Sequence, residues 1–181
     1  MIPNKKGQTA ETTLKSLPKG IKTIVINDDE ERGANWARNE GFKAVETEFV
    51  LFSDNDINWH ENAVESLLDA LERHPEASYA YGAYEMRGRK YCDMEFDENV
   101  LRLSNFISTM TLVRTKDFPG FDENIKRFQD WDVWLTMLDD DKTGVYCGRT
   151  IFDTKIRDGI THNGKVGVSE GITAIRAKHK L

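Results

Sequence analysis

Residues 48–56 read Glu-Phe-Val-Leu-Phe-Ser-Asp-Asn-Asp, an apolar run that ends abruptly in two carboxylates one residue apart. The apolar part has the length and the composition of a buried strand. A second β-branched run, residues 21–26, also stops at acidic residues, 27–30. Two successive strands that end in carboxylates predict a polar site at one edge of a sheet.

Helical patterns alternate with these strands along the chain. The spacing of apolar residues predicts helices at 9–17, 33–41 and 130–138, and Asn58 with Glu61 predicts a capping box for a fourth helix that ends at Pro75. Further strands are expected at 77–84, 106–113, 144–146 and 150–152. Residues 87–103 are expected to form an irregular, exposed excursion.

The alternation of strands and helices predicts an α/β domain with a largely parallel sheet, in which ligands bind beyond the carboxyl ends of the strands. A length of 181 residues allows one domain with a sizeable core. We therefore expect a single domain over residues 1–181, with an irregular C-terminal tail from about residue 157.

Composition excludes several classes of protein. The formal charge of −6 argues against a nucleic-acid or anionic-membrane binder, and a phosphorylated ligand would need a cation or local Arg and Lys side chains to offset repulsion. No apolar run approaches the roughly 18 to 20 residues of a transmembrane helix, and no signal peptide is expected. Cys92 and Cys147 do not form a disulfide framework or a zinc motif, so we expect reduced thiols and a cytoplasmic location.

The turn after the strand at 48–52 contains Asp54 and Asp56, which can face one hard cation because such cations prefer oxygen ligands. The spacing alone is weak, since 130–132 and 139–141 share it. An acidic turn that only improves solubility and caps a helix is the alternative.

Other candidate residues are individually ambiguous. Asp28 could accept a hydrogen bond from a nucleobase or ribose, or could be an ordinary turn aspartate. Arg32 and Arg38 could face a diphosphate, or could be surface arginines. Asp130 begins a helix, where a carboxylate usually only complements the helix dipole.

Taken in order, these segments resemble the motifs of family-2 glycosyltransferases of the GT-A fold. The resemblance covers nearly the whole chain, and its strength lies in the order of the motifs rather than in any one of them. Residues 118–123, Phe-Pro-Gly-Phe-Asp-Glu, resemble the "GGFDE" turn, and 129–135, Gln-Asp-Trp-Asp-Val-Trp-Leu, resemble the "EDxDLWL" helix. The other matching segments are 2–3, 25–29, 33–41, 49–56, 59–63 and 78–82.

The resemblance implies a Rossmann-like nucleotide-diphospho-sugar transferase fold, with an open mixed sheet flanked by helices. The implied activity is a hexosyltransferase-type reaction (EC 2.4) that moves a sugar from a nucleotide-diphosphate donor, expected to be a UDP-sugar, to a carbohydrate or other hydroxyl acceptor. The implied cofactor is Mn²⁺ or Mg²⁺, and the implied mechanism inverts the anomeric centre with an aspartate base.

The resemblance also assigns roles to positions of this chain. Asp130 would be the catalytic base. Asp56 would ligate the metal, with Asp54 and, tentatively, His162. The residues implied in binding the nucleotide-sugar are Pro3, Asp28, Arg32, Arg38, Asp54 and Asn55. Three departures affect donor preference and metal geometry: Gln129 replaces the usual acid, Ile57 stands where a further aspartate is common, and Lys5 replaces a tyrosine.

Rival functions remain open from the residues alone. A phosphatase of the haloacid-dehalogenase type would use Asp54 as nucleophile and Asp56 as acid, but residues 57–59 fit its pattern poorly. A calcium loop would need glycine where Trp59 stands. A sugar-nucleotide pyrophosphorylase would need a glycine-rich loop that residues 3–7 do not supply. A non-catalytic relic would bind UDP with manganese but transfer nothing.

Overall fold

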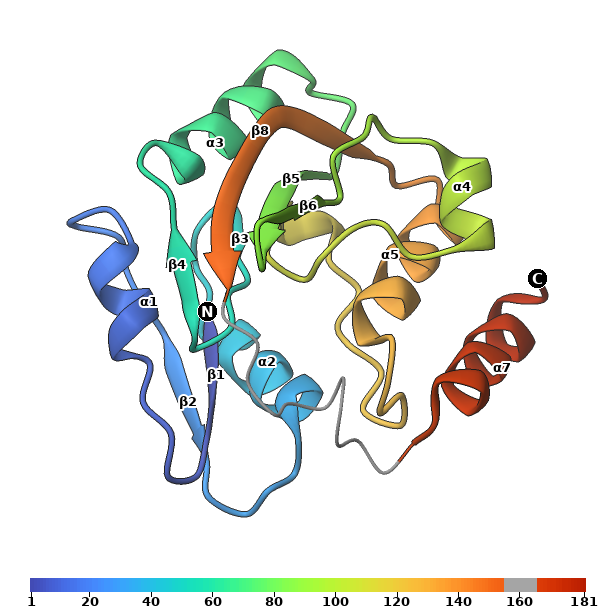
Figure 1. Ribbon diagram of the computed structural model, residues 1–181, viewed down its shortest axis with the longest axis horizontal. Helices are drawn as coiled ribbons and strands as arrows, with labels where there is room; N and C mark the ends of the chain where they lie inside the picture. Colours follow the sequence, from blue (N-terminus) through green and yellow to red (C-terminus); the bar gives the residue numbers. More distant parts are fainter. Residues whose placement is uncertain (155–165) are drawn as a thin grey trace.

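A curled mixed β-sheet flanked by helices forms the centre of the protein in the computed structural model, which describes residues 1–154 and 166–181 (Figure 1). The predicted α/β class with an open mixed sheet is confirmed. The strands are β1 Ile2–Lys5, β2 Val25–Asp28, β3 Phe49–Leu51, β4 Ile57–Trp59, β5 Tyr79–Met86, β6 Arg89–Tyr91, β7 Leu112–Arg114 and β8 Gly144–Thr154.

The strand order of the large sheet is β3-β7-β5-β8-β4, with β6 paired to β5. Among the strands of the described residues, β5 and β8 are the only parallel pair within it, and the separate pair β1–β2 is also parallel. The expectation of a largely parallel sheet was therefore wrong. Parallel neighbours need a crossover connection, usually a helix, whereas β5 turns directly into β6 and the following segment leads back into an antiparallel β7.

Main-chain hydrogen bonds at Met1 join the small sheet to the large one. Met1 N donates to Leu51 O at 2.6 Å, and Ser53 N donates to Met1 O at 3.0 Å. This pattern places the start of β1 parallel to the end of β3. The carboxyl ends of β1, β2 and β3 consequently lie at one edge, as the acidic strand ends predicted.

The helices are α1 Glu11–Ser16, α2 Ala34–Phe42, α3 Ala63–Arg73, α4 Glu98–Leu103, α5 Gln129–Asp139 and α7 Val168–His179, with a 3₁₀ turn η1 at Thr115–Asp117. The capping box predicted for α3 is wrong, because Asn58 lies in β4 and its Nδ2 donates to Asp153 Oδ2 at 2.6 Å. The helix begins instead after Asn62, which has a left-handed backbone.

The segment 87–113 differs most from expectation. Part of it forms β6 and α4, and α4 is capped by Asp97, whose Oδ1 accepts hydrogen bonds from the main-chain N of Asn99 and Val100. The strand expected from residue 106 begins only at Leu112. Its apolar side chains are buried in the core without pairing as a strand, which hydrophobicity alone does not distinguish. The two short strands expected at 144–152 form one irregular strand, β8.

The C-terminal region was expected to be irregular from about 157, and this is wrong for Val168–His179, which form α7. Helix α7 packs on α5 through the fully buried Ile175 and through ion pairs of Lys178 and His179 with Asp132. These contacts are largely charged, so the apolar periodicity of the segment was a weak signal. Residues 155–165 lie outside the described part of the chain.

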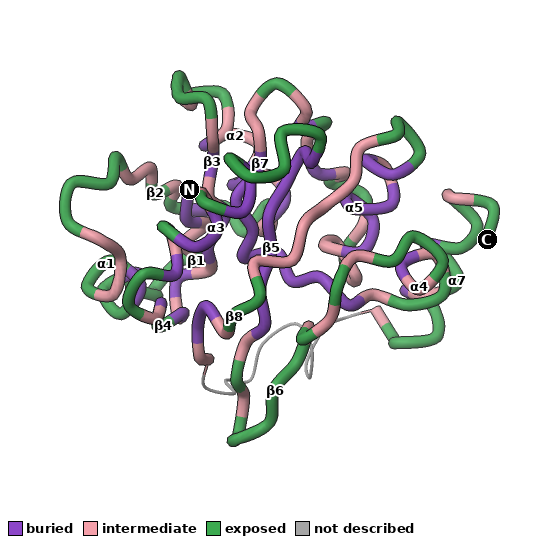
Figure 2. The backbone as a smooth tube through the Cα atoms, turned by 90° about the horizontal axis from the view of Figure 1, so that it is seen from above, coloured by how far each residue is buried: buried purple, intermediate pink, exposed green. Residues whose placement is uncertain are grey.

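Two clusters of buried apolar side chains pack against the large sheet. Figure 2 shows β5, at the centre of this sheet, largely in the purple of buried residues. On one side Trp134 of α5 stacks on Tyr79 of β5, with ring centroids 4.6 Å apart. On the other, Leu67 and Leu71 of α3 pack in a cluster with Phe152 of β8. The core therefore fixes α5 and β8, the two elements next to the candidate site.

Both cysteines are free thiols, as expected. A cytoplasmic location stays a prediction. Across the described ranges 1–154 and 166–181, the helices are too short or too polar to cross a membrane.

Candidate active site

Hydrogen bonds made by the side chain of Thr13 in α1 hold the turn that follows β3. The Thr13 side chain is fully buried, and its Oγ1 accepts a hydrogen bond from Ile57 N at 3.0 Å. The same hydroxyl lies 2.9 Å from the carbonyl oxygen of Asp54, to which it donates. One threonine thus fixes both ends of the turn that carries Asp54 and Asp56.

Four amide side chains form a hydrogen-bonded chain between this turn and the ends of β1 and β2. Asn55 Nδ2 donates to Asn4 Oδ1 at 2.8 Å and to Gln8 Oε1 at 2.9 Å. Asn4 Nδ2 in turn donates to Asn27 Oδ1 at 2.9 Å. Asn55, a predicted donor-binding residue, therefore also positions the turn. Pro3, another, lies half-buried in β1 opposite Ile26.

Asp28 organises the loop between β2 and α2. Its carboxylate is buried, and its two oxygens accept hydrogen bonds from Arg32 N at 2.9 Å and Gly33 N at 2.7 Å. Gly33 has φ of 115°, which a residue with a side chain would adopt only with strain. The Arg32 side chain pairs with Glu30 and lies over the ring of Trp36, so the structure does not bring it to Asp54.

Arg38 of α2 is the centre of the site. It is 4% exposed, and its Nη2 donates to Asp54 Oδ1 at 2.7 Å. Its Nη1 donates at 3.3 Å to Asn35 Oδ1 and at 3.3 Å to Gln129 Oε1. Arg38 therefore joins the acidic turn to the first residue of α5. An amide at 129 accepts this bond without adding a second negative charge beside Asp130.

Two asparagines of α2 hold the loop that leads into α5. Asn35 Nδ2 donates to Asp122 O at 2.7 Å, and Asn39 Nδ2 donates to Phe121 O at 2.9 Å. Phe121 N returns a hydrogen bond to Asn39 Oδ1 at 2.8 Å. Sequence reasoning did not single out these residues for a role. Their spacing of four residues, which places both on one helix face beside Arg38, was the available signal.

Asp130 lies in the first turn of α5 and faces the side chains of Arg38 and Asn105. Its Oδ1 accepts a hydrogen bond from Trp131 N at 2.9 Å. Burial raises the pKa of Asp130 above its usual range, and the bonds from Trp131 and Asn105 together with the charge of Arg38 only partly offset this. A carboxylate with these surroundings is a stronger base than a solvent-exposed aspartate.

The possible metal ligands are few. Among residues 1–154 and 166–181 no group of three or more His, Cys, Asp or Glu side chains is arranged to hold a metal ion. Asp54 and Asp56 share the turn, and both are half-buried. His162 lies outside the described residues.

Comparison with known proteins identifies the family. The family model for glycosyl transferase family 2 matches residues 6–121, more than half of the chain, and the chain belongs to this family. The resemblance seen in the motifs is confirmed. No curated protein sequence gives a significant match.

Solved structures show the same fold at low sequence identity. Residues 1–349 of S. aureus TarS in complex with UDP-GlcNAc align with a TM-score of 0.75 and 15% identity over 98% of this chain and 64% of that one. Glucosyl-3-phosphoglycerate synthase from Mycobacterium tuberculosis, with Mn²⁺, UDP and glucosyl-3-phosphoglycerate, aligns with a TM-score of 0.68 and 15% identity over 99% of this chain and 78% of that one. The chain thus spans less than two thirds of the TarS structure.

Proposed function

We propose that this protein transfers a sugar from a UDP-sugar to an acceptor hydroxyl, with Mn²⁺ or Mg²⁺ at the donor and Asp130 as general base. The observation that carries the proposal is the bridge made by Arg38. It joins Asp54 on the predicted donor side to Gln129, the residue before Asp130. One side chain therefore links the proposed donor side to the start of the helix that carries the proposed base.

The turn after β3 fits a divalent cation bound together with its substrate. Asp54 uses Oδ1 for Arg38, and Asp56 lies two residues further on the same turn. Mg²⁺ usually binds through one or two carboxylates plus substrate phosphates rather than in an all-protein cage. A site with two aspartates matches that donor set. The M. tuberculosis synthase was crystallised with Mn²⁺ or Mg²⁺ and UDP.

The remaining predicted donor residues surround this turn. Arg38 and Asn55 hold its shape, and Asp28 fixes the loop beside it. Pro3 belongs to the strand between them. Arg32 is exposed on the outer side of the loop, where it would reach the donor only by leaving Glu30.

In the proposed reaction the acceptor oxygen attacks the anomeric carbon from the side opposite the diphosphate, which inverts that centre. Asp130 takes the proton of the acceptor hydroxyl, and the Trp131 amide keeps its carboxylate oriented. When bound, the cation neutralises charge that develops on the leaving diphosphate. Family membership favours this chemistry over the phosphatase, and activity separates it from a non-catalytic relic.

Thermal-shift titration tests the donor site. We expect UDP to raise the Tm more than GDP or dTDP does, only with Mn²⁺ or Mg²⁺ present, since a ligand at about 100 times its Kd stabilises by about 2.7 kcal/mol. Asp56→Asn should remove the metal dependence. Asp140→Asn, an exposed carboxylate at the far end of α5, is the matched control and should keep it. If none of the three nucleotides stabilises the protein in a metal-dependent way, the donor assignment is wrong.

A further inference from the structure

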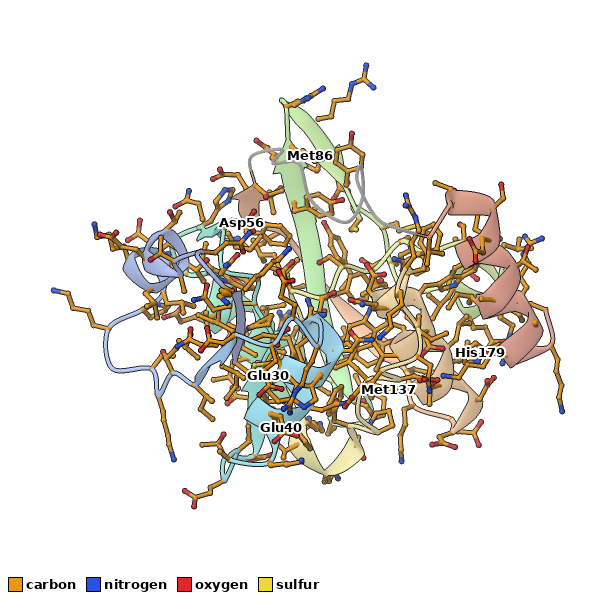
Figure 3. All side chains as sticks on the ribbon, turned by 90° about the horizontal axis from the view of Figure 1, so that it is seen from below. Glu30, Glu40, Asp56, Met86, Met137 and His179 are labelled. Atoms are coloured by element: carbon orange, nitrogen blue, oxygen red, sulfur yellow. The ribbon has the colours of Figure 1, made fainter. Side chains whose placement is uncertain are left out.

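A short two-stranded arm projects from the sheet beside the candidate site. Strands β5 and β6 are joined by a turn of only Arg87 and Gly88, which have φ of 52° and 68°. Two consecutive positive φ values are typical of the type I′ turn that suits a tight hairpin. Figure 3 shows Met86, the last residue of β5, on this arm where it extends beyond the body of the protein.

Stacked aromatic rings fix the base of the arm. The ring of Tyr84 in β5 stacks on that of Tyr91 in β6, with centroids 5.2 Å apart, and on Phe152 of β8 at 5.0 Å. Phe152 also contacts the ring of Trp59, a buried residue of β4. Cross-strand aromatic pairs stabilise a hairpin, so the arm is a defined element rather than a loose loop.

The end of the arm is positively charged in a chain whose net charge is −6. Arg87, Arg89 and Lys90 are all exposed. Lys90 pairs with Asp93 at 3.4 Å and lies opposite Glu85. Arg87 and Arg89, in contrast, have no ion pair or hydrogen bond from their side chains within residues 1–154 and 166–181. Two available guanidinium groups on a rigid arm suit phosphate, which arginine binds through two parallel hydrogen bonds.

The register of the sheet places this arm next to the candidate site. Across β8, Asp153 pairs with Glu85 of the arm and Thr154 pairs with Ile57, directly after Asp56. Adjacent strands are about 4.8 Å apart, so the arm begins roughly 10 Å from the acidic turn. Figure 3 shows Asp56 and Met86 on the same side of the molecule and His179 far from both.

Two residues at the foot of the arm lie within range of the charge of Asp130. Burial raises the pKa of the Cys92 thiol to about 12, and the nearby charge of Asp130 adds to this shift. Tyr84 experiences the same charge. The foot of the arm and the carboxylate of Asp130 therefore belong to the same region of the molecule.

We propose that Arg87 and Arg89 bind phosphate groups of an extended, phosphate-bearing acceptor, whose free hydroxyl then reaches Asp130. This inference rests on the proposed function and specifies its acceptor. Two to three strand residues separate Tyr84 from the turn, a span of about 7 to 10 Å. An acceptor held at the turn has to extend at least this far along the arm towards Asp130, which favours a chain with repeated phosphate groups over a single small phosphate.

A lipid surface fits the arm less well than a phosphate-bearing chain in solution. Only two basic side chains are available, and Glu85 and Asp93 lie just behind them. Anionic membranes are usually bound by clusters of four to eight Lys or Arg residues. The turn itself, Arg87 and Gly88, offers no apolar side chain for insertion.

Fluorescence anisotropy with labelled inorganic polyphosphate tests the proposal on the full chain. The double variant Arg87→Gln/Arg89→Gln should bind at least about tenfold more weakly, since each hydrogen bond to a charged group contributes about 1.5–3 kcal/mol before competition with water and salt. Arg73→Gln/Arg176→Gln changes the charge equally at exposed sites on α3 and α7 and should stay within about twofold of wild type. Binding should weaken as salt rises.

Two outcomes would overturn the inference: equal polyphosphate affinity in the two double variants, or no polyphosphate binding by wild type at low salt. Binding to phosphatidylglycerol vesicles that depends on Arg87 and Arg89, without polyphosphate binding, would assign the arm to a membrane instead. The Tm shift with UDP and Mn²⁺, measured on the same proteins, distinguishes a failure of the arm proposal from a failure of the proposed donor site. It should be unchanged in Arg87→Gln/Arg89→Gln, and its absence in wild type would count against the proposed function alone.

Discussion

Asp130 and Asp132 are two residues apart at the start of α5, yet their surroundings are opposite. Asp132 is 2% exposed and lies 2.9 Å from Lys178 Nζ and 2.9 Å from His179 Nε2, both on α7. Asp130 has no ion pair within 4 Å among the described residues and is half-buried near Arg38, whose guanidinium is itself engaged by Asp54. One carboxylate is neutralised and the other is not.

The geometry of a helix explains the difference. Residues two apart project about 200° from each other around the axis, so one side of α5 faces the site and the other faces α7. Asp132 is occupied by its contacts with Lys178 and His179 of α7 and does not face the site. Partial burial raises the pKa of Asp130, which has no such ion pair, so this carboxylate takes up a proton more readily than an exposed one. The comparison supports Asp130 as the base and gives Asp132 a structural role.

The largest effect is expected from Asp130→Asn. This change should lower the release of UDP from a UDP-sugar in the presence of an acceptor by a factor of about 10²–10⁴, the usual contribution of general base catalysis. The Tm shift with UDP and Mn²⁺ should persist, because Asp54 and Asp56 are untouched. Unchanged turnover would remove Asp130 from the base role.

The pH dependence of wild-type turnover sharpens the same assignment. Because burial raises the pKa of Asp130, the ionised form required of a base is lost at a higher pH than for an exposed aspartate. Activity should therefore fall as the pH drops through this raised pKa. Asp132→Asn should retain this acid limb in any residual activity.

A smaller effect, on stability rather than chemistry, is expected from Asp132→Asn. Removing one partner of a buried ion pair usually leaves a charge uncompensated and is strongly destabilising. Here the cost is reduced, because Asp122 still pairs with Lys178 and Asp139 still pairs with His179. We expect a loss of about 2–3 kcal/mol in the free energy of unfolding, measured with urea. Asp140→Asn should cost less than about 0.5 kcal/mol. Equal losses in the two variants would contradict the structural role of Asp132.

The sequence predicted the elements at the polar edge of the sheet better than it predicted the directions in which the strands pair. The strand and turn at 48–56, the helix at 33–41 and the helix of Asp130 were all located, because each combines a periodic apolar pattern with a clear end. The alternation of strands and helices wrongly predicted a largely parallel sheet and missed α4, since pairing depends on contacts between distant residues; the mixed sheet was implied only by the family resemblance. Arg38 was a candidate, but its hydrogen bond to Gln129, which completes the bridge from Asp54, joins residues 91 positions apart and is visible only in the fold.

The same limit applies to α7. A polar segment with few apolar positions predicts little by itself, and the carboxylates that bind Lys178 and His179 lie about forty residues away on α5. The identical spacing of acidic residues in 54–56 and 130–132 likewise gave no sign that one pair shares a turn while the other divides between two sides of a helix.

The smallest effect concerns His179, which fastens α7 to α5. Its side chain is 4% exposed, and its Nε2 and Nδ1 lie 2.9 Å from Asp132 Oδ1 and 2.9 Å from Asp139 Oδ2. Burial alone lowers the pKa of His179, but the hydrogen bonds and charges of the two carboxylates outweigh it and raise the pKa above 6.5. The folded state therefore favours the protonated ring. Its contribution is fully present below the pKa of the unfolded chain, near 6.5, and is lost as the pH rises through the raised value.

Replacing His179 with Gln should therefore reduce stability by about 1 kcal/mol at pH 6 and by much less at pH 8.5, measured as urea midpoints at both values. His74→Gln, at an exposed histidine that pairs only with Glu76, is the control and should shift both midpoints little. A loss at His179 that is equal at the two pH values would mean that packing rather than charge fastens α7. Of the two contacts that distinguish Asp132 from Asp130, only the one with Lys178 would then be an interaction between charges.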